Sequence, residues 1–126
     1  MATARFQILS LVSRTRATGA EPAPGVTWRF LSANNRSLGR SALVFPDVAA
    51  CQVALAMLRR NLARATAATS QHGAGQWVWR VRLAESEIAI SSRLYQRRVR
   101  AKLACEAFVE LVATIAPNGA VQVVYL

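Results

Sequence analysis

The strongest constraint on the fold is a pattern that the sequence contains twice. Phe45 and Tyr95 stand 50 residues apart, and at the same offset Ser41 matches Ser91. Further along the chain, Ala54, Leu55 and Leu58 match Ala104, Cys105 and Phe108. Upstream, a match of Trp28 to Trp77 needs a shift of one residue. A repeat of this length predicts two copies of one small structural unit.

Each copy has the hydrophobic periodicity of strands followed by that of a helix. Residues 77–83 alternate between apolar and more polar types, which is typical of a strand with one buried face. From Val48 to Leu62, apolar residues recur every three or four positions, as on one side of a helix. The predicted strands are 6–12, a strand that starts at Trp28 and ends before the turn 33–36, and then 38–41, 65–70, 77–83, 88–92 and 120–126. The predicted helices are 46–64 and 98–116.

The remaining segments have the composition of turns and loops. Residues 71–76 form a Gly-rich turn, Pro117 and Gly119 end the second helix, and 13–25 is an exposed loop or insertion. The sequence therefore predicts one pseudo-symmetric α+β domain spanning 1–126. Its repeat 1 covers about 4–70, including the loop insertion 13–25, and its repeat 2 covers about 71–126.

These motifs resemble the YegP-like family, small bacterial proteins of unassigned function. The family pattern is an aromatic-led strand, a turn, a second strand that ends in Ser or Thr, a Tyr or Phe, and then a helix. The matching segments here are Trp28 to Asn35, Leu38 to Ser41 and Phe45 in one copy, and Trp77 to Leu83, Ile88 to Ser92 and Tyr95 in the other. The family's usual Gly after the turn Asn is Arg36 in this sequence.

The resemblance implies a specific topology. It consists of two tandem β-β-β-α-β repeats that form one antiparallel sheet, with two helices packed on it and with the C-terminal strand of each repeat exchanged onto the other. The family has no established catalytic residues, so the resemblance assigns none to this chain.

The charge of the chain is strongly one-sided. Lys and Arg number 16 against 6 Asp and Glu, for a formal net charge of +10, and such a surface attracts polyanions. Five cations lie within ten residues at the start of the second predicted helix, where helical N–H groups also favour phosphate. With two arginines of one strand face, the predicted anion-binding residues are Arg80, Arg82, Arg93, Arg97, Arg98, Arg100 and Lys102.

Two kinds of function fit this charge. The first is a small basic binding protein that contacts the phosphates of RNA or DNA without reading their sequence. The alternative is a protein-interaction module, or an accessory subunit of a larger assembly with an acidic partner. Nucleic-acid binding predicts that the arginines converge on one surface, whereas an interaction module predicts scattered arginines around an apolar patch. Membrane binding is not expected, because neither helix has a continuous basic face beside exposed aromatics.

We expect no enzyme activity, cofactor or metal. The single histidine, His72, lies in a turn without an acidic or Cys partner nearby in the sequence. The two close pairs of acids, Glu85 with Glu87 and Glu106 with Glu110, lie in a hairpin turn and on the outer face of a helix. Catalysis by such a pair would also need a desolvated cleft.

The two cysteines are predicted to be core residues in a reduced cytoplasmic protein. Cys51 and Cys105 are too few and too far apart for a metal motif or a disulfide framework. Both fall at core-facing helix positions, where a free thiol behaves as a small hydrophobic group.

Overall fold

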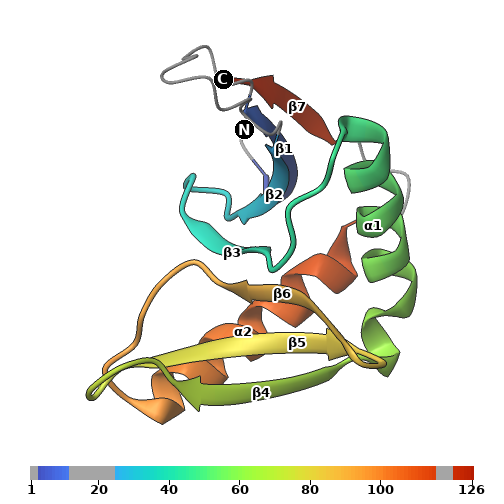
Figure 1. The fold of residues 1–126 in the computed structure, drawn as a ribbon. Helices are drawn as coiled ribbons and strands as arrows, with labels where there is room; N and C mark the ends of the chain where they lie inside the picture. Colours follow the sequence, from blue (N-terminus) through green and yellow to red (C-terminus); the bar gives the residue numbers. More distant parts are fainter. Residues whose placement is uncertain (1–2, 12–24, 116–120) are drawn as a thin grey trace, which may run out of the picture.

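The computed structural model describes residues 3–11, 25–115 and 121–126 of the chain (Figure 1). Nearly all of the predicted loop 13–25 and the predicted helix stop at 117–119 lie outside these residues. The described strands are β1 (Arg5–Leu11), β2 (Gly25–Leu31), β3 (Ser37–Ser41), β4 (Thr66–Gln71), β5 (Trp77–Leu83), β6 (Ser86–Ser91) and β7 (Gln122–Tyr125). The helices are α1 (Val48–Asn61), which continues into the 3₁₀ turn η2 (Leu62–Arg64), and α2 (Arg98–Thr114).

The predicted α+β class is confirmed, and α1 begins where local chemistry favours a helix start. Asp47 is the N-cap of α1, and its carboxylate accepts a hydrogen bond from the N–H of Ala50 at 2.7 Å. This cap satisfies one of the N–H groups that the first helical turn leaves unpaired. Cys51, Leu55 and Leu58 form the buried side of α1, as their spacing predicts.

The strands form one mixed sheet in the order β4-β5-β6-β3-β2-β1-β7. The prediction of a wholly antiparallel sheet is wrong at one edge, because β7 pairs in parallel with β1. The position beside β5 is taken by β4, which runs antiparallel to β5. The matching position beside β2 is taken by β1, so β7 lies one strand further out and runs in the same direction as β1.

The second half departs from the β-β-β-α-β order that the resemblance implies. Within the described part of 71–126, only β5 and β6 precede α2, which agrees with the two predicted strands 77–83 and 88–92. The strand beside β5 is β4, which directly follows the first helical segment in the chain. In the same way, β7 follows α2 but lies against β1 at the opposite end of the sheet (Figure 1).

Two contacts recur in both halves and fix which residues correspond. The hydroxyl of Ser41 accepts from the N–H of Trp28, and the hydroxyl of Ser91 accepts from the N–H of Trp79, each at 3.3 Å. An isolated bridge also joins β2 to Phe45, and another joins β5 to Tyr95. By these contacts Trp28 corresponds to Trp79 and not to Trp77. The sequence match chose the first aromatic residue of each strand, but the serine contact sets the position along the strand.

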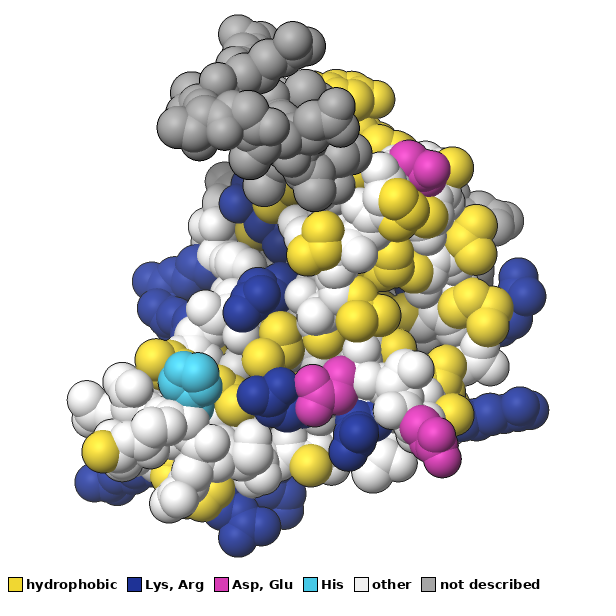
Figure 2. Space-filling view, in the orientation of Figure 1, with side chains coloured by type: hydrophobic (Ala, Val, Ile, Leu, Met, Phe, Trp, Pro, Cys, Tyr) yellow, Lys and Arg dark blue, Asp and Glu magenta, His cyan; other side chains and the backbone are white. Residues whose placement is uncertain are grey.

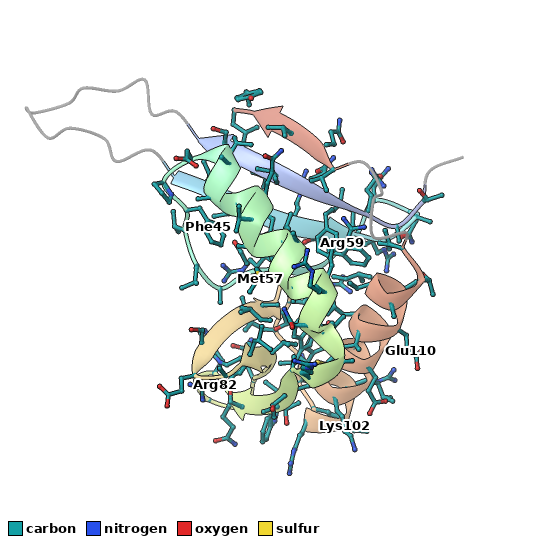
Figure 3. The ribbon with its side chains drawn as sticks, turned by 90° about the vertical axis from the view of Figure 1, so that its right-hand side faces the viewer. Phe45, Met57, Arg59, Arg82, Lys102 and Glu110 are labelled. Carbon is teal, nitrogen blue, oxygen red and sulfur yellow. The ribbon has the colours of Figure 1, made fainter. Side chains whose placement is uncertain are left out.

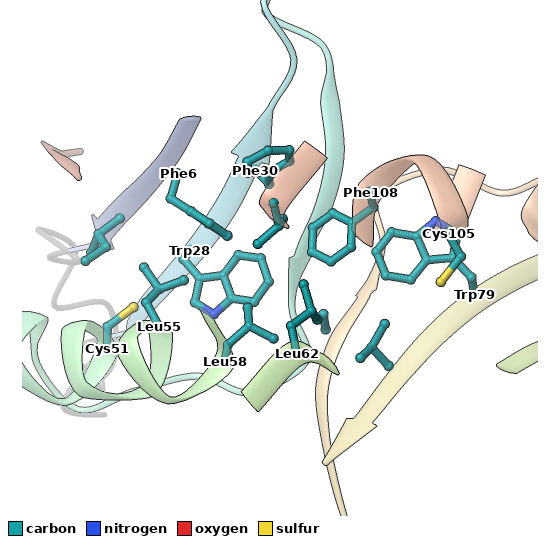
Figure 4. Packing of buried hydrophobic residues seen from close by; sticks show 14 of the residues in the cluster. Phe6, Trp28, Phe30, Cys51, Leu55, Leu58, Leu62, Trp79, Cys105 and Phe108 are labelled. Carbon is teal, nitrogen blue, oxygen red and sulfur yellow. The ribbon is translucent and has the colours of Figure 1, made fainter. Parts of the chain in front are cut away.

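A row of aromatic rings joins the two halves in the core (Figure 4). Phe30 contacts Phe108 edge-on, with 5.5 Å between ring centroids, and Trp79 packs against the other side of Phe108 at 4.8 Å. Phe6 continues the row, at 5.4 Å from Trp28 and 4.8 Å from Phe30. Leu55 and Leu58 of α1 and Phe108 of α2 belong to the same core cluster, so both helices pack on one face of the sheet. No helix among the described residues lies on the opposite face.

Gly39 is required by the approach of Trp79 to β3. A Cβ atom at Gly39 would lie 2.7 Å from Cη2 of Trp79 and 3.1 Å from Cε1 of Phe108. Both rings are fully buried, so neither can move aside easily. The seam between β3 and β6 therefore needs a residue without a side chain at this position.

We predict that Gly39→Ala lowers the free energy of unfolding by about 1–3 kcal/mol, because overpacking in a filled core forces strain. Gly25→Ala is the matched control, since a Cβ there meets only Val44 Cγ1, at an ordinary 3.4 Å. Its effect should stay within about 0.5 kcal/mol. Urea unfolding of both variants measures the difference, and equal effects would contradict the proposed role of Gly39.

Candidate functional site

A row of Cα partners crosses the helix-free face of the sheet from one edge to the other, and five of its seven residues are polar or cationic. The Cα partners across the seven strands are Gln122, Gln7, Arg29, Arg40, Ile90, Arg80 and Ala68. In the same strands, the side chains of Trp28 and Trp79 alternate with these residues and point to the core. A Cβ atom at Gly39 would point to the same side. Strand alternation thus directs the arginines of the row toward the face that no helix covers.

Neighbouring side chains fix the position of Arg29. Its Nε donates to Oε1 of Gln7 at 2.9 Å, and Nε2 of Gln7 donates in turn to Oε1 of Gln122 at 2.6 Å. Gln7 is only 7% exposed, so this ladder is held at the level of the sheet. No described residue accepts a hydrogen bond from Nη1 or Nη2 of Arg29, so the ladder leaves these two nitrogens available to an anion.

Arg80 is the partly neutralised member of the row. Its Nη1 donates to Oε2 of Glu87 at 2.9 Å, and its Nε donates to the hydroxyl of Ser70 at 3.3 Å. Both side chains of the ion pair are about one third exposed (32% and 35%), so the pair contributes little to stability. Arg40 and Arg82 are exposed and have no hydrogen bond or ion pair with another described residue.

The predicted anion-binding residues lie on two different surfaces. Arg80 reaches Ser70, whereas Nε of Arg98 donates to Oγ1 of the adjacent Thr69 at 3.2 Å. Because consecutive strand residues point to opposite faces, Arg80 and Arg98 lie on opposite sides of β4. Arg82 alternates onto the same face as Arg80. Arg98 and Lys102 line a groove between α2 and β4 on the helix side. Arg93, Arg97 and Arg100 are exposed and lie within five residues of the first residue of α2.

Two arginines of the row were not among the predicted site residues. Arg29 lies between the core residues Trp28 and Phe30, so its strand already indicates an outward direction, whereas Arg40 lies between Gly39 and Ser41 and has no such hydrophobic signal. Local sequence patterns do not give the β2–β3 register, which sets Arg29 and Arg40 directly opposite each other. The β3–β6 pairing, which brings Arg80 into the same row, is equally invisible to local patterns.

The start of α2 lacks the cap that α1 has. Arg97 occupies the N-cap position and makes no side-chain hydrogen bond to the first turn, and that turn contains no acid. Arg98 is held in place by Thr69 and by the indole of Trp77, 6.0 Å from its guanidinium carbon. Cations at this end oppose the helix dipole. This arrangement favours an anion near the helix start, but it also weakens α2.

We predict that Arg97→Asp raises the free energy of unfolding by about 1 kcal/mol, because it supplies an N-cap and a favourable charge. Asp47→Ala, which removes the existing cap of α1, should lower it by about 1 kcal/mol. Urea unfolding at low salt measures both changes. An unchanged or lower stability of Arg97→Asp would show that α2 does not need a cap.

His72 and the two candidate pairs of acids lie in different parts of the described structure. His72 is exposed in the turn between β4 and β5, and Glu87 is engaged with Arg80. Glu106 and Glu110 line a groove along α2 that is described below. Within the described ranges, no group of three or more His, Cys, Asp or Glu side chains could hold a metal ion.

The two thiols are buried, as their helix positions predict. Burial, and for Cys105 also the nearby carboxylate of Glu106, raises the pKa of Cys51 and of Cys105 to about 11. Both therefore stay protonated at neutral pH and are poor nucleophiles.

In the described parts of the chain, no helix has the length and apolar character needed to cross a membrane.

The fold is similar to two solved bacterial structures. One is yegP from E. coli, a protein of unknown function, with a TM-score of 0.68 and 13% identity over 99% of this chain and 96% of that chain. The other is a UPF0339 protein from Shewanella oneidensis, with a TM-score of 0.66 and 10% identity over 95% of this chain and 92% of that chain. No protein-family model matches the sequence, and no curated protein matches it. The predicted YegP-like resemblance is confirmed at the level of the fold.

Proposed function

We propose that this protein is a non-catalytic binding protein that contacts the phosphates of RNA or DNA with the helix-free face of its sheet. The observation that carries the proposal is the direct cross-strand pair of Arg29 and Arg40. Like charges opposite each other on neighbouring strands destabilise a sheet, and the fold has no need of them. A phosphate bound between two guanidinium groups would remove that repulsion and form charge-assisted hydrogen bonds.

The composition of the same face supports binding that does not depend on sequence. Among its described strand residues, the acid is Glu87, which Arg80 already neutralises. None of the described strand residues that alternate onto this face is aromatic, because Trp28 and Trp79 are buried in the core. Without rings for base stacking, affinity would come from phosphate contacts alone.

We expect that Arg40→Gln with Arg82→Gln weakens binding to mixed-sequence RNA and duplex DNA, and lowers the salt slope of log K by about one unit for each lost phosphate contact. Both residues are exposed, so the fold should tolerate the change. The measurement is fluorescence anisotropy of labelled nucleic acid across a salt series.

The matched control is Arg60→Gln with Arg64→Gln, which removes the same charge from exposed positions near the end of α1. A third variant, Arg97→Gln with Arg100→Gln, tests the start of α2. An equal loss of nucleic-acid affinity in all three variants would show that net charge alone, and not a particular surface, causes the binding. Absence of binding at low salt would refute the proposal.

A protein-interaction module is the second proposal, and the outer face of α1 favours it. Val53 and Met57 are 64% and 48% exposed there, and Leu43 and Val44 are exposed in the preceding loop. Hydrophobic side chains gather over α1 in Figure 2, while Lys and Arg side chains spread over the rest of that view. An apolar patch with cations around it suits a partner protein with an acidic rim.

We also propose that the two halves are tandem copies of one unit, each with its last strand exchanged onto the other. The burial class of the residue is the same at every position of 51–65 and 101–115. The pairing of β4 with β5 and of β7 with β1 is further support. A cytoplasmic location is proposed because two free buried thiols suit a reducing compartment.

A further inference from the structure

The strand β4 forms an edge of the sheet without the features that usually prevent pairing. Its residues are Thr-Ala-Ala-Thr-Ser-Gln, with neither a charge nor a proline, and it pairs with β5 without a bulge. Edge strands commonly carry charges, prolines or bulges that block the addition of another strand. This edge is therefore competent to pair with an extended segment.

The hairpin after β4 shows which backbone groups face outward. The N–H of His72 donates to the carbonyl of Gln76 at 2.8 Å, so His72 faces β5. Alternate residues of an antiparallel strand direct their N–H and C=O groups to opposite sides. Gln71, Thr69 and Ala67 consequently direct these groups away from β5, where no described strand lies.

The corresponding position beside β1 is occupied by β7. The carbonyl of Ser10 accepts from the N–H of Leu126 at 2.9 Å, and Val123 lies opposite Ile8 in the parallel register. Val121 and Val123 pack against the core. At the β1 edge, therefore, β7 is the added strand, and its alternate apolar side chains pack against the core.

The two edges correspond residue by residue through the buried tryptophans. The residue opposite Trp28 on the next strand is Ile8, and the residue opposite Trp79 is Thr69. A large buried aliphatic side chain in one half is thus replaced by a small polar one in the other. Thr69 is partly exposed, whereas Ile8 is fully buried.

Two residues earlier on the same face, Phe6 in β1 corresponds to Ala67 in β4. Phe6 is buried in the core, but Ala67 is exposed. A groove of about 580 Å³ lies between β4 and α2, and Ala67 and Thr69 are among the residues that line it. Ala65, Val81 and Val109 contribute to its apolar lining.

Along the helix side of this groove, positive side chains come first and negative side chains follow. Arg98 and Lys102 come first along α2, and Glu106 and Glu110 follow one and two turns later (Figure 3). The contact between Arg98 and Thr69 sets the cations near the C-terminal end of β4. A carboxylate on a bound molecule is therefore favoured at that end.

We propose that the β4 edge and its groove bind an extended segment of a partner protein, parallel to β4, whose alternate residues are bulky and apolar. The added strand would supply main-chain hydrogen bonds, and its side chains would fill the groove, as in other cases of strand addition. Because β4 has Ala and Thr where β1 has Phe and Ile, the segment carries larger side chains than the valines of β7. An acidic residue follows them and pairs with Arg98 or Lys102. The inference is independent of the phosphate-binding proposal.

The test uses a synthetic peptide, Ala-Leu-Gln-Leu-Val-Tyr-Glu. It keeps the alternation of β7, enlarges the two inward valines and ends in a carboxylate. Ala-Leu-Leu-Gln-Val-Tyr-Glu, which breaks the alternation, is the control peptide. We expect saturable binding of the first peptide in fluorescence anisotropy, and slower hydrogen exchange at the N–H groups of Ala67, Thr69 and Gln71.

The matched protein variants are Ala67→Phe, which fills the groove, and Thr66→Phe, which adds a ring at an exposed β4 residue that does not line the groove. Binding should weaken by about tenfold or more in Ala67→Phe and stay within about twofold in Thr66→Phe. Thermal unfolding confirms that both variants fold, and Ala67→Phe should not be less stable than the parent protein.

Three results would overturn the proposal. The first is no saturable binding, or equal binding of both peptides. The second is binding that Ala67→Phe leaves unchanged, or amide protection on strands other than β4. The third is a concentration-dependent dimer that protects the same amides, which would identify a second copy of this chain as the occupant. Because none of these readouts involves nucleic acid, the outcome is separate from the phosphate-binding experiment.

Discussion

The whole fold depends on the packing of the Trp79 ring over Gly39 and against Phe108. This contact lies where β3 of the first half meets β6 of the second, and it continues through Phe30 to Phe6. Each buried aromatic side chain removes roughly 150–250 Å² from water, so a continuous row of them outweighs most other contributions in a chain of this size. Trp79 also interacts with Tyr95: burial raises the pKa of the Tyr95 phenol, and the nearby Arg93 and the side chain of Trp79 partly offset that rise.

The row of cations on the other face is a direct consequence of the same packing. Once Trp28 and Trp79 are directed toward the helices, strand alternation directs Arg29 and Arg80 to the open face. The β3–β6 pairing, which brings Gly39 beneath the Trp79 ring, also brings Arg40 into line with Arg80. Core and surface are therefore coupled, and a shift of one residue at the seam would both open the aromatic row and scatter the arginines.

Much of the fold could be predicted from local patterns. The alternation of 77–83 and the helical spacing from Val48 onward give elements that agree with β5 and α1 to within a few residues. Cys51 and Cys105 were assigned to the core for the same reason. Register and strand order depend on contacts between distant segments. The parallel β7, the correspondence of Trp28 with Trp79 and the Arg29–Arg40 pair were therefore beyond a reading of the sequence alone.

The uncharged edge of β4 also bears on colloidal behaviour. A bare strand edge on one side of a sheet and a different strand, β7, on the other would allow copies to add head to tail without closing, which is the geometry of open fibres. A net charge of +10 opposes this association through long-range repulsion between copies. That repulsion is screened beyond roughly 10 Å at 0.1 M salt. The excess of arginine thus protects the exposed edge against self-assembly, and a neutralising polyanion would withdraw that protection.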